Sequence, residues 1–104
     1  MEDFVRQSLL YDFYGDLLTE HQKEIFGAAV LEDMSLGEIA AAHGISRQGV
    51  SDCVKRCKGI LEGYEEKLGL VKKFLEIRER VEDIGRAETI EEARKISGEI
   101  LELL

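Results

Sequence analysis

The sequence predicts an all-α protein, and three observations support this prediction. The 104 residues contain no proline, the residue that most strongly disrupts helix interiors. Hydrophobic residues make up 44% of the chain and charged residues 35%, which is typical of a globular domain. Apolar residues recur every three or four positions, whereas the alternating pattern of a strand is rare. We therefore expect one helical domain over residues 1–104, with about five helices.

An apolar stripe and a capping signal mark the first two helices. We expect a first helix at about residues 2–15. The stripe beginning in this helix consists of Leu10, Phe13, Tyr14, Leu17 and Leu18. Thr19 and Gln22 have the spacing of a capping box, so a second helix should begin there. Its expected buried face is Ile25, Phe26, Ala29 and Val30.

A helix-turn-helix is predicted over residues 35–62. Ser35 and Glu38 form a capping box for a short helix with Leu36 facing inward, and Ser46 caps a longer helix. Two short helices cross steeply when a small residue lies at their contact and a glycine forms the turn. The expected motif core is Ile39, Ala40, Gly44, Ile45, Val50 and Cys53. His43 occupies a position where an apolar residue is usual, and we expect it to be half-buried.

The apolar stripe continues along the longer helix and through a C-terminal extension, residues 70–104. In the longer helix it includes Val54, Cys57, Ile60, Leu61, Tyr64 and Leu68. In the extension it includes Leu70, Val71, Phe74, Ile77, Val81 and Ile84, and then Ile90, Ala93, Ile96, Ile100 and Leu101. Thr89 and Glu92 should cap the last helix. The extension either closes the core or forms an interface, and the apolar terminal ILELL favours a homodimer.

The outer face of the longer helix carries the candidate nucleic-acid-binding residues. They are Ser46, Arg47, Gln48, Ser51, Lys55, Arg56 and Lys58. Arg and Gln at a helix start can read guanine and adenine edges, and the lysines with Arg56 and Ser46 can hold phosphates. Residues 46–58 have a net charge of +3. Because the formal net charge of the whole chain is −8, the other 91 residues together carry −11.

Other kinds of function find little support in the sequence. Cys53, Cys57 and His43 lack a fourth partner for zinc, and we expect reduced, buried thiols and no metal or cofactor. Adjacent carboxylates diverge on a helix and no glycine-rich phosphate loop is present, so an enzyme is not expected. No segment approaches the roughly 20 apolar residues that span a bilayer, and the acidic start does not resemble a signal peptide. We expect no membrane association and a cytoplasmic location.

Three runs of residues resemble a known family. LLYDFYGDLLTEHQKEIF, ISRQGVSDCVKR and LEGYEEKLGLVKKF are similar to the YlxM-like family of small bacterial helix-turn-helix proteins, over about residues 3–75. Residues 19–61 also resemble sigma-factor region 4, a winged-helix-like DNA-binding fold. The family resemblance implies a regulatory role and a link to the signal recognition particle pathway. It places Ser46, Arg47, Gln48, Ser51, Lys55 and Arg56 on the recognition helix.

Two hypotheses about function follow. In the first, the protein is a regulator that binds DNA or structured RNA, for example the signal recognition particle RNA. In the second, its acidic faces dock on a basic partner, for example a protein component of that particle, without direct nucleic-acid binding. The recognition-helix charge favours the first hypothesis, and the −11 remainder favours the second.

Overall fold

The computed structural model describes residues 3–104, and these residues form six α-helices and no strand. The helices are α1 (Asp3–Tyr14), α2 (Glu20–Phe26), α3 (Leu36–His43), α4 (Arg47–Leu68), α5 (Leu70–Arg86) and α6 (Ile90–Leu103). A 3₁₀ turn, Gly15–Leu17, follows α1, and a π-helical turn, Gly27–Leu31, follows α2. The all-α prediction is confirmed, with one helix more than the expected five. Glu2, where the first helix was expected to begin, lies outside the described residues.

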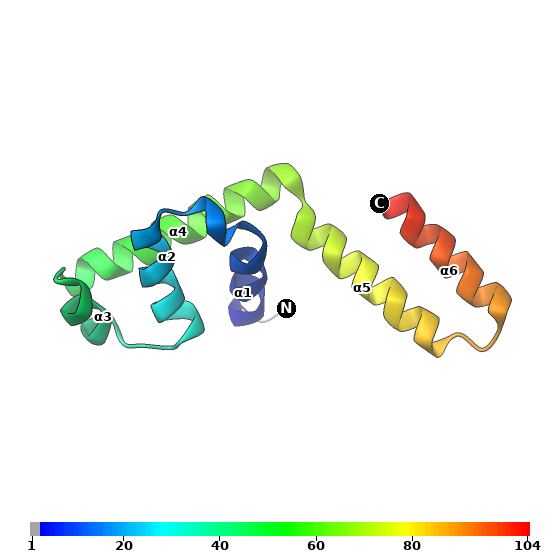
Figure 1. Ribbon diagram of the computed structural model, residues 1–104, viewed down its shortest axis with the longest axis horizontal. Coiled ribbons are helices and arrows are strands. Elements are labelled where there is room, and N and C mark those ends of the chain that lie inside the picture. Colours follow the sequence, from blue (N-terminus) through cyan, green and yellow to red (C-terminus); the bar gives the residue numbers. More distant parts are fainter. Residues whose placement is uncertain (1–2) are drawn as a thin grey trace. The chain divides into compact units, whose positions relative to one another are not determined.

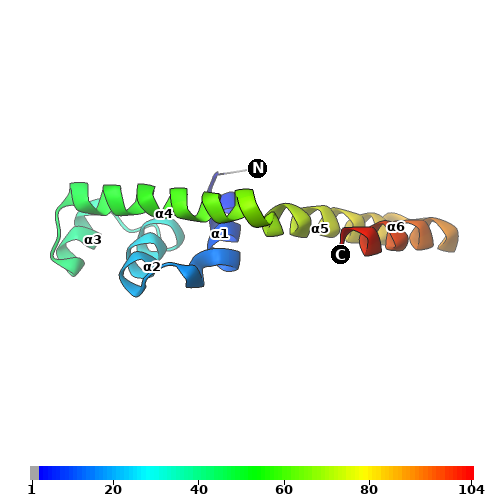
Figure 2. The same cartoon turned by 90° about the horizontal axis from the view of Figure 1, so that it is seen from above.

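The chain divides into two compact units, and the second begins at Gly69. In the first unit, α1, α2 and α3 gather along one side of the long helix α4, as Figures 1 and 2 both show. The second unit is the antiparallel pair of α5 and α6 (Figure 1). Gly69 has φ of 63°, a left-handed conformation that ends α4 and that glycine adopts without strain. That the chain forms one domain stays a prediction.

Side-chain pairs hold α1 against α4. Arg6 donates two hydrogen bonds of 2.7 Å to the Glu62 carboxylate, and the Arg6 guanidinium lowers the pKa of Glu62. Deeper in the unit, the buried Tyr14 hydroxyl donates a 2.6 Å hydrogen bond to Glu65. The Tyr14 ring also stacks on Tyr64, with ring centroids 6.0 Å apart. These contacts fix one end of α4 relative to the rest of the first unit.

The predicted stripe of the first helix is only partly correct. Leu10, Tyr14 and Leu18 are buried, but Phe13 and Leu17 are 39% and 56% exposed. The α-helix ends at Tyr14, and a 3₁₀ turn rotates successive side chains by about 120° instead of about 100°. Leu17 therefore leaves the apolar face.

The capping boxes at Thr19 and Ser35 are both present, so the predicted starts of α2 and α3 are confirmed. Leu36 was expected to face inward, yet it is 43% exposed. It is the first residue of α3, where no preceding helical turn covers the side chain. His43 is half-buried, as predicted.

Candidate nucleic-acid interface

The turn between α3 and α4 sets the direction of α4. Gly44 has φ of 65°, and the Ile45 amide donates a 3.1 Å hydrogen bond to the Ala40 carbonyl, which closes α3. The Ser46 hydroxyl then accepts a 2.9 Å hydrogen bond from the Gly49 amide, which caps α4. The Ser46 oxygen thus accepts a hydrogen bond at the helix start, while the hydroxyl hydrogen remains available for donation to a ligand.

The expected motif core lies largely between α2, α3 and α4. Ile39, Ala40 and Val50 are buried in one cluster with Ile25 of α2. Ile45 and Cys53 are partly buried and pack against that cluster, together with Ala28, Ala29, Met34 and Val54. Gly44 lies outside it, at the exposed turn. The cluster anchors one face of α4, so the opposite face of its first three turns points to solvent.

Four candidate or neighbouring polar side chains come together on this outer face. Gln48, Asp52, Lys55 and Arg56 are all exposed. The Gln48 amide nitrogen donates a 2.8 Å hydrogen bond to the Asp52 carboxylate, one helical turn later. Among residues 3–104, neither Lys55 nor Arg56 forms an ion pair. The face therefore offers two unpaired cations beside an ordered amide–carboxylate pair.

The remaining candidates lie on or near the flanks of α4. A Cβ built on Gly37 would meet the Arg47 guanidinium at 3.1 Å, so Arg47 lies along α3. Ser51 is half-buried. Lys58 lies 3.8 Å from the Asp3 carboxylate of α1. The structure therefore directs Lys58 toward α1 instead of grouping it with Lys55 and Arg56.

A hollow of about 320 Å³ adjoins the outer face, between α4 and the start of α2. Its α4 side includes Gly49, Asp52 and Arg56, and its other side includes Thr19 and His21. Sequence analysis did not select Thr19 or His21 for this region. The capping signal at Thr19 located a helix start, but nothing in the sequence indicated that this start lies beside Arg56.

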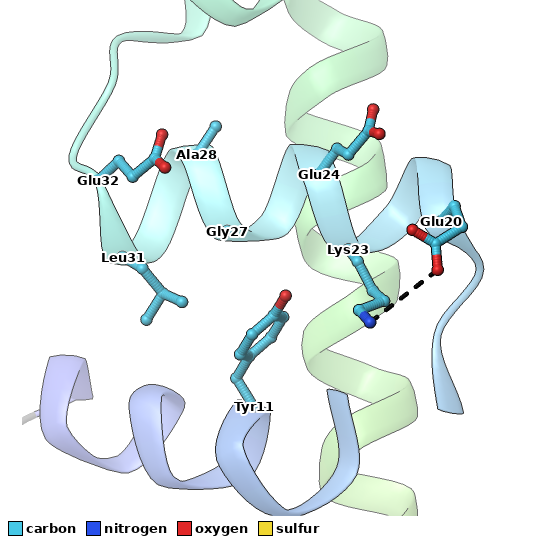
Figure 3. Close-up of a pocket in the computed structure, with 8 residues that line it drawn as sticks. All are labelled: Tyr11, Glu20, Lys23, Glu24, Gly27, Ala28, Leu31 and Glu32. Carbon is cyan, nitrogen blue, oxygen red and sulfur yellow. Dashed lines mark ion pairs between the residues drawn. The ribbon is translucent and has the colours of Figure 1, made fainter. Parts of the chain in front are cut away.

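A second hollow, of about 340 Å³, lies between α1 and α2 and is acidic (Figure 3). Glu20, Glu24 and Glu32 line it, and Tyr11 rises from α1 toward Gly27. The Lys23 ammonium forms ion pairs with the carboxylates of Asp16, at 2.9 Å, and Glu20, at 4.0 Å. Three carboxylates against one paired cation repel phosphate, so this hollow is unsuited to a polyanion.

Of the two thiols that were expected to be buried, Cys57 is a core residue and Cys53 is half-buried. Cys57 is fully buried, and burial, reinforced by the neighbouring Cys53, raises its pKa to about 12. A thiol with such a pKa is protonated at neutral pH and is a poor nucleophile and metal ligand. In the described part of the chain no three His, Cys, Asp or Glu side chains are grouped to hold a metal ion. No helix there is long and apolar enough to cross a bilayer.

Comparison with known proteins gives consistent matches. Residues 1–100 match UPF0122, described as "Putative helix-turn-helix protein, YlxM / p13 like". A UPF0122 protein of Thermoanaerobacter sp. (strain X514) is 48% identical over 99% of this chain and 88% of its own length. One from Caldanaerobacter subterraneus is 57% identical over 80% of this chain and 71% of its own length. The UPF0122 protein YlxM of Bacillus subtilis is 49% identical over 76% and 72%. The family description names a helix-turn-helix and no catalytic activity.

Proposed function

The chain belongs to the UPF0122 family of helix-turn-helix proteins, and on this premise we propose that it is a nucleic-acid-binding regulator. One observation carries the proposal. In a chain of net charge −8, the positive excess lies on residues 46–58, where Lys55 and Arg56 are exposed and unpaired among the described residues. A cationic, solvent-facing helix at the second position of a helix-turn-helix is the arrangement that enters a groove.

The favoured ligand is duplex DNA, bound with the start of α4 in the major groove. This groove admits a helix, whereas the major groove of duplex RNA is too narrow for side chains to read. Gln48 and Arg47 would contact base edges, Lys55 and Arg56 would hold phosphates, and Ser46 and Ser51 would add hydroxyl contacts. Lys58 would join them only after leaving Asp3, so we assign it a smaller share of the affinity.

Three further features complete the proposal. The protein would act as a homodimer, because two copies double a small number of phosphate contacts. It would work in the cytoplasm, where Cys53 and Cys57 stay reduced. The family resemblance of its motifs supports a role in the signal recognition particle pathway, which makes that particle's RNA the second ligand to test.

The test is fluorescence anisotropy with labelled random-sequence duplex DNA and labelled signal recognition particle RNA, each over a salt series. The variant Lys55→Glu/Arg56→Glu should lose at least tenfold in affinity because each substitution replaces a phosphate contact by repulsion. The control Lys73→Glu/Lys95→Glu makes the same change in net charge on exposed residues of α5 and α6. Equal losses in both variants would show that overall charge, and not the α4 face, determines binding.

The acidic hollow favours a second candidate function, an adaptor that binds a basic protein partner. Its three glutamates would receive a lysine or arginine side chain from such a partner. A pull-down with the GTPase subunit of the signal recognition particle tests this function, and the variant Glu20→Lys/Glu24→Lys should abolish capture. Capture that survives this variant, or that fails in the wild type, would exclude the hollow as a docking site for that subunit.

A further inference from the structure

Both helices of the second unit carry a heptad stripe, in which apolar or small residues alternate at spacings of three and four. In α5 the stripe is Leu70, Phe74, Ile77, Val81 and Ile84. In α6 and at its end it is Ile90, Ala93, Ser97, Ile100 and Leu104. A strict alternation of three and four keeps a stripe facing the centre of a coiled-coil-like bundle. The stripes contain no charged residue.

Only two of the five positions of each stripe are covered within the hairpin of α5 and α6. Ile77 and Ile84 are half-buried, and so are Ala93 and Ile100 of the other helix. The other positions of both stripes are exposed. Val81 is 54% exposed, Ile90 is 71% exposed and Leu104 is 76% exposed. The two helices thus contribute the layers of a bundle core without the helices that would complete it.

The exposed positions of both helices lie on one face of the hairpin. In α5, Val81 follows the half-buried Ile77 by four residues, and in α6, Ser97 follows the half-buried Ala93 by four. Four residues advance a helix by about 40° beyond one turn. In each helix the exposed positions are therefore rotated, in the same sense, away from the half-buried residues that face the other helix. In an antiparallel pair, equal rotation brings them to the same side. Leu101, which is 70% exposed and next to Ile100, extends this face.

We infer that this face, formed by Val81, Ile90, Leu101 and Leu104, is where a second copy of the chain docks, giving an antiparallel four-helix bundle. The inference deepens the proposed function, because it supplies the surface for the homodimer on which that function rests. The dimer would then carry two copies of α4, the helix proposed to enter the groove, which suits a two-fold symmetric duplex.

Charge favours a second copy over an acidic or basic partner. Arg78 and Glu82 at the edge of the face form an ion pair of 3.4 Å, and Glu91 and Arg94 also present both signs. Such an edge is self-complementary under a two-fold axis, whereas a basic or acidic partner calls for an edge of one sign. The net charge of the second unit is also small, with seven basic and nine acidic residues, so two copies of this unit repel each other little.

The size of the second unit also favours self-association. Gly69–Leu104 comprises only 36 residues. Units below about 40 residues usually need a disulfide, a metal or oligomerisation to bury enough apolar surface. The cysteines of the chain lie outside this unit and are free thiols. Pairing two hairpins would bury exposed positions of four heptad stripes.

The test is size-exclusion chromatography with light scattering on the full chain, without nucleic acid, over a wide range of concentration. The wild type should have twice the mass of the 104-residue chain. Val81→Glu/Leu101→Glu should raise the dimer dissociation constant at least tenfold, while Lys95→Glu, which adds the same net charge on the other side of α6, should not. The milder Leu101→Ser and far-UV circular dichroism separate loss of the interface from loss of the fold.

A monomeric wild type at every concentration would overturn the inference. So would a Val81→Glu/Leu101→Glu variant that remains folded and dimeric, since another surface would then hold the dimer. Neither result bears on Lys55 and Arg56, whose effect is measured by anisotropy. Failure of the dimer face and failure of nucleic-acid binding are therefore distinguishable.

Discussion

Asp52 is the acidic residue in the middle of the cationic face of α4, and it tempers any attraction for phosphate. Its carboxylate is exposed and accepts a hydrogen bond from Gln48. We expect Asp52→Asn to strengthen binding to duplex DNA severalfold at about 0.1 M salt, because it removes repulsion while an amide oxygen can still accept that bond. The gain should shrink as salt rises. Anisotropy titrations at two salt concentrations would measure it.

Glu66→Gln provides the matched control for Asp52→Asn. It removes the same charge from an exposed position of α4, 14 residues further along the helix. That separation is about 21 Å, beyond the screening length of about 10 Å at 0.1 M salt. Equal gains from the two variants would contradict a local role for Asp52.

The hydrogen bond from Tyr14 to Glu65 should contribute measurably to stability. Tyr14 is 1% exposed and Glu65 is 9% exposed, so little water replaces the bond if it is lost. Tyr14→Phe keeps the ring and should lower the free energy of unfolding by about 1–3 kcal/mol. Urea denaturation followed by circular dichroism would measure the change. A variant as stable as the wild type would show that Glu65 is satisfied without the phenol.

Residue spacing predicted which side chains share a face of α4, but not what each one touches. Ile39, Ala40 and Val50 were selected by their spacing, and the structure packs them together. The spacing could not reveal that Lys58 lies beside Asp3, because that contact joins helices more than 50 residues apart in sequence. Contacts between distant segments depend on the angle at which helices cross, and the local pattern leaves that angle open.

At the scale of elements, Gly44 and Gly59 have opposite roles and should respond oppositely to alanine. Gly44 has φ of 65°, where a side chain costs about 1–2 kcal/mol, so Gly44→Ala should destabilise the protein by that amount. Gly59 lies within α4, and a Cβ there would meet nothing within 4 Å. Gly59→Ala should therefore stabilise it by about 1 kcal/mol through helix propensity. Thermal and urea unfolding of both variants would measure the difference, and destabilisation by Gly59→Ala would contradict it.

Helix starts were more predictable than helix continuations. The capping boxes at Thr19 and Ser35 are local, since each requires only residues three apart. The π-helical turn Gly27–Leu31 has no such local signal. It adds a residue to one turn, so the side chains after Phe26 lose α-helical phase, and Ala29 and Val30 are half-buried instead of fully buried. Packing against neighbouring elements, which the sequence does not show, selects such turns.

At the scale of the whole molecule, the segregation of charge was readable from the sequence, whereas the role of the C-terminal helices was not. Counting charges along the chain located the positive excess on residues 46–58. An amphipathic stripe, by contrast, looks the same whether it closes its own core or meets a partner. The exposures of Val81 and Ile90, set against half-buried Ile77 and Ile84, are the structural observation that favours the second use.

The salt dependence of binding should report how many phosphates the outer face of α4 contacts and whether two copies bind one duplex together. Lys55 and Arg56 offer two phosphate contacts per copy, and each neutralised phosphate contributes about −0.9 to the slope of log affinity against log salt. A dimer on a duplex of two or more turns should therefore give a slope of about −4, and a single copy about −2. Anisotropy titrations of the wild type and of Val81→Glu/Leu101→Glu should yield these two values.

Lys95→Glu should weaken binding slightly yet keep the steeper slope, because it changes net charge without removing a phosphate contact or the dimer. A dissociated variant with an unchanged slope would mean that the two copies of α4 do not engage one duplex together. The second copy would then serve stability alone. Since the slope counts released ions and not total affinity, the acidic remainder of the chain lowers binding strength in every variant without obscuring this comparison.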